Sequence, residues 1–99
     1  MTVRFSPVPP LDDFAAEFAA ALVTVLDPDD ADRIDRTAID RQTNLLSLPL
    51  DSAALLELMT RLEDTYRVFI PHETAFEFST VGEIGDYIAD RLAAKAARG

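Results

Sequence analysis

An aspartate and a serine stand together where a loop turns into an apolar helical segment, and these two residues are the best placed for chemistry. Asp51-Ser52 follows residues 48–50 (Leu-Pro-Leu) and precedes Ala53. A serine in the first turn of a helix can help to cap it. It can also hold a phosphate, because unpaired backbone N–H groups and the helix dipole stabilise negative charge there. The second use predicts a carrier in which Ser52 bears a phosphodiester-linked arm.

The other reactive side chains indicate no catalytic site and no metal site. The chain has no cysteine, which excludes a disulfide, a thiolate metal site and a cysteine nucleophile. Its one histidine, His72, follows Pro71 beyond the helix that Ser52 opens, so we interpret it as a surface or capping residue. The aspartates of residues 27–35 do not match the EF-hand pattern, and we interpret them as a solvated acidic loop.

Length and charge limit the classes of protein to which the chain can belong. Its 99 residues, 48% of them hydrophobic, predict a single folded domain. A formal net charge of −9 repels nucleic acid and anionic membranes, and it favours partners with basic faces. We find no secretory signal and no membrane-spanning run, so we expect a cytoplasmic protein that binds neither nucleic acid nor membranes.

The pattern of apolar residues predicts an all-α domain with three main helices and a short third helix. The core should cover about residues 11–92, with an extended lead-in over 1–10 and a frayed tail over 93–99. We expect helices over Leu11–Leu26, Ser52–Tyr66 and His72–Phe76, and a last one opening at Ser79-Thr80.

Local signals support these boundaries. Asp51 is a good N-cap for the second helix, and Thr80 with Glu83 fits a capping box for the last one. The long connection over residues 27–50 is acidic in its first half and leucine-rich in its second. We expect its leucines to pack over the core, with one short helical turn around Ala31–Arg36.

At this point the residues resemble the acyl carrier protein family, in which a motif close to Gly-x-Asp-Ser-Leu opens the second helix. The same register here reads Pro49-Leu50-Asp51-Ser52-Ala53. Four further segments are similar to family motifs in the same order: Glu57-Leu58, Leu62-Glu63-Asp64-Thr65-Tyr66, Ile70-Pro71, and residues 79–88. The resemblance covers roughly residues 11–92 and implies a small four-helix bundle of acyl-carrier type.

The resemblance also implies a function. A separate phosphopantetheinyl transferase would use Mg²⁺ and coenzyme A to attach 4′-phosphopantetheine to Ser52, with Asp51 helping to orient the Mg²⁺. The arm would then carry acyl groups as thioesters in polyketide, fatty-acid-like or other specialised biosynthesis. The protein itself would be a monomeric carrier and not an enzyme. Ala53, Glu57, Glu63 and Asp64 would form the face that meets basic partner enzymes.

Two departures from the family pattern bear on recognition. Pro49 replaces the usual glycine, and Ala53 replaces the leucine that helps to dock partners in the family. We therefore expect dedicated pathway partners. We interpret the residues that could line a cargo slot as plain packing: Leu46, Leu55, Met59, Leu62, Phe69 and Ile84. The same interpretation applies to the aromatics Phe14, Phe18, Phe76 and Phe78.

Two alternatives to an acyl carrier stay open. One is a peptidyl or aminoacyl carrier that works with an adenylating enzyme. The other is a carrier-like interaction domain that is never modified, which the departures at Pro49 and Ala53 motivate. An enzyme ranks last, because the sequence offers no catalytic constellation.

Overall fold

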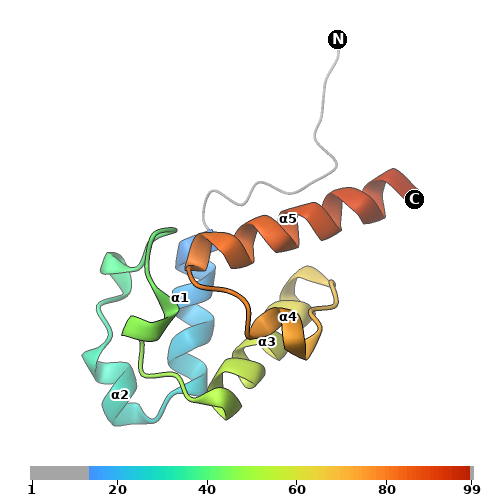
Figure 1. Cartoon of the computed structure of the whole chain (residues 1–99). Helices are drawn as coiled ribbons and strands as arrows, with labels where there is room; N and C mark the ends of the chain where they lie inside the picture. The colour runs from blue at the N-terminus through green and yellow to red at the C-terminus, as the bar shows by residue number, and fades with distance from the viewer. Residues whose placement is uncertain (1–13, 99) are drawn as a thin grey trace.

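The computed structural model describes residues 14–98, which form a helical bundle (Figure 1). The predicted all-α fold is confirmed. The lead-in over 1–10 and the predicted start of the first helix at Leu11 lie outside the described residues. The helices are α1 (Phe14–Val25), α2 (Pro28–Arg33), α3 (Ser52–Tyr66), α4 (His72–Ala75) and α5 (Val81–Arg98), with 3₁₀ turns η1 (Arg36–Ala38) and η2 (Leu45–Ser47).

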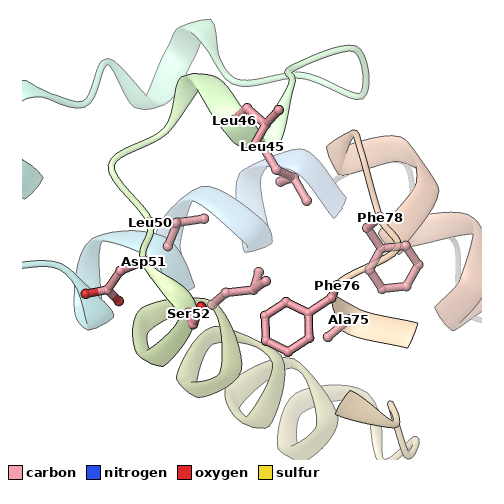
Figure 2. Close-up of a pocket in the computed structure, with 9 residues that line it drawn as sticks. Leu45, Leu46, Leu50, Asp51, Ser52, Ala75, Phe76 and Phe78 are labelled. Carbon is pink, nitrogen blue, oxygen red and sulfur yellow. The ribbon is translucent and has the colours of Figure 1, made fainter. Parts of the chain in front are cut away.

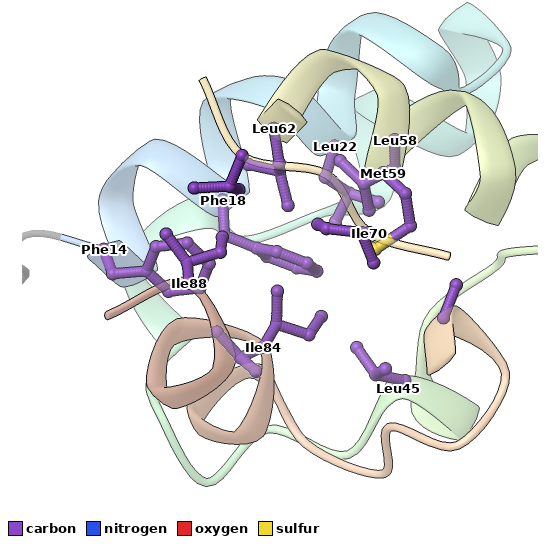
Figure 3. Packing of buried hydrophobic residues seen from close by; sticks show 13 residues of the cluster. Phe14, Phe18, Leu22, Leu45, Leu58, Met59, Leu62, Ile70, Ile84 and Ile88 are labelled. Carbon is purple, nitrogen blue, oxygen red and sulfur yellow. The ribbon is translucent and has the colours of Figure 1, made fainter. Parts of the chain in front are cut away.

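One hydrophobic core holds α1, α3 and α5 together (Figure 3). Each of these helices places an apolar face inward, because its apolar residues recur every three or four positions. Burying such side chains is the main favourable contribution to folding. Its buried members on these helices include Phe14, Phe18 and Leu22 of α1, Leu58, Met59 and Leu62 of α3, and Val81, Ile84 and Ile88 of α5.

The connection between α1 and α3 is fastened to the first turn of α5 by backbone hydrogen bonds. The N–H of Val81 donates to the Thr43 carbonyl at 3.1 Å, and that of Gly82 donates to the Arg41 carbonyl at 2.8 Å. The first N–H groups of a helix have no partner within the helix, so the connection satisfies donors that would otherwise be orphaned. In return, the N–H of Leu45 donates to the Ser79 carbonyl at 2.9 Å.

The predicted capping box at the start of α5 is confirmed. The N–H of Glu83 donates to the Thr80 hydroxyl at 3.3 Å, and the N–H of Thr80 donates to the Glu83 carboxylate at 3.3 Å. The predicted turn in the connection forms earlier than expected, because α2 begins at Pro28, a residue suited to the first helical position.

The end of α3 is tied to α5 by a lysine. Arg67 adopts a left-handed conformation with φ 59°, and its carbonyl accepts a hydrogen bond from Lys95 Nζ at 2.6 Å. A cation is favourable at this position because the helix dipole is negative at its C-terminus. α5 remains helical through Arg98, beyond the apolar stripe that ends near residue 92. The predicted fraying of residues 93–99 stays a prediction.

Some of the packing predicted from the sequence is wrong. Phe14 and Phe18 are buried and Phe78 is half-buried, but Phe76 is 52% exposed. Leu46 and Phe69 are likewise not packing residues, since they are 93% and 72% exposed. No helix among residues 14–98 is long and apolar enough to cross a membrane.

We predict that Gly82→Ala destabilises the protein. A Cβ atom at this position would lie 2.9 Å from the Arg41 carbonyl oxygen, so the backbone of the connection would have to shift. The strain should exceed the gain in helix propensity of about 1 kcal/mol. The free energy of unfolding should fall by about 1–2 kcal/mol, as measured by urea denaturation.

Arg41→Ala supplies the control for this prediction. It removes the guanidinium carbon Cζ of Arg41, which a Cβ at Gly82 would also approach at 3.2 Å, but it leaves the Arg41 Cβ, at the same distance, and the carbonyl oxygen in place. Gly82→Ala should remain destabilising in that background. A stabilising effect there would show that the backbone contact is not the cause.

Candidate functional site around Ser52

Asp51 caps α3 and thereby frees Ser52 from that task. Asp51 Oδ1 accepts the N–H of Ala54 at 2.7 Å, and the Asp51 carbonyl accepts the N–H of Leu55 at 2.9 Å. The N-cap predicted for Asp51 is confirmed. Ser52 is therefore the first residue of the helix, and it is exposed. Its hydroxyl stands at a fixed place on the surface because the cap fixes the backbone beneath it.

The first turn of α3 fits a phosphodiester on this serine. Asp51 satisfies the N–H groups of Ala54 and Leu55, but those of Ser52 and Ala53 have no partner within the helix. Free N–H groups at the positive end of the helix dipole stabilise an anion. The residues present can therefore hold the phosphate of a phosphopantetheine arm.

An apolar pocket of about 230 Å³ opens beside Ser52 (Figure 2). Ser52 and Asp51 stand at one edge of it, and α4 and the segment after it form the facing wall (Figure 2). Apart from this Asp-Ser pair, every lining residue is apolar: Leu45, Leu46, Leu50, Leu55, Ala75, Phe76 and Phe78. Such a lining would shelter an apolar group that leaves the helix at Ser52.

A second pocket, of about 240 Å³, borders the same turn on the side of α1 and α2, and its polar residues are acidic. Its carboxylates come from Asp27, Asp30, Asp51 and Glu57, and Ala53 also lines it. The start of α3 therefore lies between an apolar surface and an acidic one. A partner that covers Ser52 would meet different chemistry on its two sides.

The residues predicted to form a docking face have different surroundings. Ala53 and Asp64 are exposed on α3, and Glu57 pairs with Arg61 one turn further along at 3.4 Å. Such exposed pairs contribute little to stability. Glu63 is half-buried, and its Oε2 accepts the N–H of Ile70 at 2.7 Å. The docking roles of these residues stay predictions, and Glu63 has a structural task as well.

Two shifted titratable groups lie away from the site. Hydrogen bonds from the hydroxyl and N–H of Thr37 lower the pKa of Asp35 below its usual value. Burial, assisted by the charge of Glu17, raises the pKa of Tyr66. Neither Asp35 nor Tyr66 lines a pocket beside Ser52, and neither does His72, which is exposed at the start of α4.

Comparison with known families shows to which family the chain belongs. The family model described as a phosphopantetheine attachment site matches residues 30–88, which include Asp51, Ser52 and most of the surrounding pockets. The chain belongs to this family of carrier proteins. The resemblance drawn from the sequence is thus confirmed, and with it the prosthetic group of the family, 4′-phosphopantetheine.

Curated relatives agree with this assignment to the carrier family. An acyl carrier protein of Streptomyces coelicolor is 39% identical over 49 residues, which cover 50% of this chain and 53% of that protein. An acyl carrier protein of Lactobacillus johnsonii is 41% identical over 56 residues, which cover 56% of this chain and 70% of that protein. The chain therefore spans only about half the length of the first relative.

Solved structures extend the similarity to most of the chain. The hexanoyl ACP of the actinorhodin polyketide synthase of Streptomyces coelicolor superposes with a TM-score of 0.63 and 31% identity, covering 78% of this chain and 87% of that one. The 3,5-dioxohexyl ACP of the same synthase gives 0.59 and 27%, covering 95% and 98%. The carrier-type helical bundle predicted for this chain is confirmed.

Sequence reasoning missed two parts of the site. It assigned Leu46 and Phe76 to packing, whereas both line the rim of the pocket beside Ser52. It also treated Asp27 and Asp30 only as part of an acidic loop, whereas both border the first turn of α3. The leucines of the connection could have indicated this surface. They lie outside any helical periodicity, so the sequence gives no reason to place all of them in the core.

We predict that Glu63→Ala destabilises this carrier fold. The substitution leaves the N–H of Ile70, a residue that is only 1% exposed, without its acceptor. The free energy of unfolding should fall by about 1–2 kcal/mol in urea denaturation. Glu63→Gln should lose less, because its amide oxygen can still accept the bond.

The matched control is the neighbouring carboxylate, Asp64, which is exposed. Asp64→Ala should change the free energy of unfolding by no more than about 0.5 kcal/mol. Equal losses for Glu63→Ala and Asp64→Ala would contradict the structural role of Glu63.

Proposed function

We propose that this protein is an acyl carrier protein whose 4′-phosphopantetheine arm is attached to Ser52. One observation carries the proposal: Ser52 is exposed at the capped start of α3, within the matched family segment, and borders an apolar pocket. The arm supplies a terminal thiol that holds an acyl group as a thioester. The chain supplies the attachment point and the surface that partner enzymes recognise, and it is not itself a catalyst.

Attachment would replace the phosphoanhydride bond of coenzyme A with a phosphodiester bond to Ser52. A phosphopantetheinyl transferase would direct the Ser52 hydroxyl at the inner phosphorus of coenzyme A. The Oγ–phosphorus bond forms, the anhydride bond breaks, and the nucleotide half leaves as adenosine 3′,5′-bisphosphate. The hydroxyl proton would pass to a base that the transferase supplies. Free N–H groups of Ser52 and Ala53 would stabilise the resulting phosphodiester. Asp51 would help to orient the Mg²⁺, an ion that prefers carboxylate oxygens.

Polyketide biosynthesis is the pathway class that we favour. The two solved structures that superpose on this chain are named as ACPs of the actinorhodin polyketide synthase. One is named for an acyl group, hexanoyl, and the other for a 3,5-dioxohexyl group described as a triketide mimic. These names support an acyl cargo over an aminoacyl one. The single-domain organisation over 1–99, the monomeric state and the cytoplasmic location expected from the sequence stay predictions.

We propose partner enzymes with basic docking faces. The chain carries a net charge of −9, and carboxylates of Asp27, Asp30 and Glu57 border the turn that bears Ser52. Opposite charge on the partner would raise the rate of association.

We predict that incubation with coenzyme A, Mg²⁺ and a broad-specificity phosphopantetheinyl transferase adds one phosphopantetheine to the protein, as measured by intact mass. Ser52→Ala should abolish the gain, because it removes the only atom proposed to be modified. Ser47→Ala is the matched control. Ser47 is also an exposed serine of a short turn near the site, and its variant should be modified like the wild type.

The outcomes separate a carrier from an unmodified interaction domain. A gain that Ser52→Ala abolishes supports the carrier. No gain with either the broad-specificity transferase or one from the protein's own source would overturn the proposal and favour the interaction domain.

We predict that Asp51→Asn separates the cap of α3 from the metal role. Asparagine caps a helix about as well as aspartate, so the free energy of unfolding should change by less than about 0.5 kcal/mol. The lost charge should lower the initial rate of phosphopantetheine transfer at least about tenfold at low Mg²⁺. Asp51→Ala should lower both stability and rate. An unchanged rate for Asp51→Asn would leave Asp51 with the cap alone.

A further inference from the structure

Leu46 is an apolar side chain held in water by an ordered turn. It is 93% exposed, compared with 72% for Phe69 and 52% for Phe76. Its backbone N–H donates to the Asn44 side chain at 2.8 Å within η2. The preceding residue, Leu45, is buried and bonds to Ser79. Leu46 is therefore presented from a fixed position, with a buried neighbour as its anchor.

A second exposed apolar residue faces the same pocket. Phe76 follows α4, is 52% exposed, and lines the pocket together with Leu46 and Ser52 (Figure 2). We call Leu46 and Phe76 the apolar rim. In the first turn of α3 the exposed apolar residue is Ala53, which offers only a methyl group, whereas Ala54 and Leu55 are half-buried. Most of the apolar area around Ser52 thus comes from the connection and from the end of α4.

We propose that the apolar rim is the contact through which the phosphopantetheinyl transferase binds this carrier. The partner would offer a shallow apolar depression for Leu46 and Phe76. It would place basic groups toward the pocket lined by Asp27, Asp30 and Glu57. This inference rests on the proposed function, because it assumes that enzymes act at Ser52.

Two features favour a protein partner over other occupants. Any enzyme that reaches the Ser52 hydroxyl must cover the pocket edge that the rim forms, so the rim is continuous with the surface that such an enzyme buries. Acidic groups on the opposite side of Ser52 would fix the orientation of that enzyme. A second copy of this chain is disfavoured, because each copy carries a net charge of −9.

The test measures kcat and KM for phosphopantetheine transfer to apo-protein variants, with a transferase that modifies the wild type. Leu46→Ala should raise KM about tenfold with little change in kcat, since truncating a central apolar contact weakens docking. Leu46→Met keeps the apolar volume and should restore the wild-type KM within about twofold. Phe76→Ala should act in the same direction as Leu46→Ala.

Phe69→Ala is the matched control. Phe69 is 72% exposed but follows the far end of α3, about 22 Å from Ser52 along a 15-residue helix. Its truncation should leave KM within about twofold of the wild type. Thermal unfolding of the Leu46 and Phe69 variants should match the wild type, because these side chains are largely exposed. Phe76→Ala should lower the unfolding temperature slightly, because about half of the Phe76 side chain is buried.

Each outcome decides a different question. If the transferase modifies the wild type and Leu46→Ala with equal KM, the docking role is overturned while the carrier function stands. If Leu46→Ala alters only the sedimentation of the free protein, the rim is a self-association surface and the proposal is wrong. If Leu46→Ala changes only the increase in thermal stability that acylation of the arm produces, the rim contacts the acyl group and the proposal is again wrong. If no transferase modifies Ser52, the carrier function itself fails.

Discussion

The surface around Ser52 depends on the backbone hydrogen bonds that fasten the connection to the start of α5. The carbonyls of Arg41 and Thr43 accept the first N–H groups of α5, and Ser79 accepts the N–H of Leu45. A long loop would otherwise keep much conformational entropy. These hydrogen bonds hold the second half of the connection in one conformation against the helices. The turn η2 is thereby held in place relative to α3. Its residues Leu45 and Leu46 then form one wall of the pocket beside Ser52.

At the start of α3, Asp51 caps the helix and leaves the Ser52 hydroxyl free of that role. Asp51 takes the cap, which a serine could also supply, and so the Ser52 hydroxyl remains exposed at the end of the helix. The remaining free N–H groups and the helix dipole favour a phosphate at this place. The cap that orders the backbone therefore also orders the residue that we propose as the attachment point.

Surface chemistry changes from one side of this serine to the other. The apolar rim of Leu46 and Phe76 stands on one side, and the carboxylates around Asp27 and Asp30 border the other. Exposed apolar residues offer nothing to the stability of the isolated domain, whereas buried ones such as Leu45 do. Their presence beside an attachment point is therefore best explained by contact with another molecule.

The sequence by itself predicted the three main helices, and it indicated Ser52 as the residue that we propose for attachment. Local physics sets these features: the three-to-four periodicity predicted α3 at Ser52–Tyr66, and capping chemistry predicted the roles of Asp51 and Thr80. Only the tertiary structure decided which apolar residues outside the helices are buried. Leu45 and Leu46 are adjacent and chemically identical, yet one is 8% and the other 93% exposed. Their fates differ because distant hydrogen bonds orient the turn, and no local pattern encodes that direction.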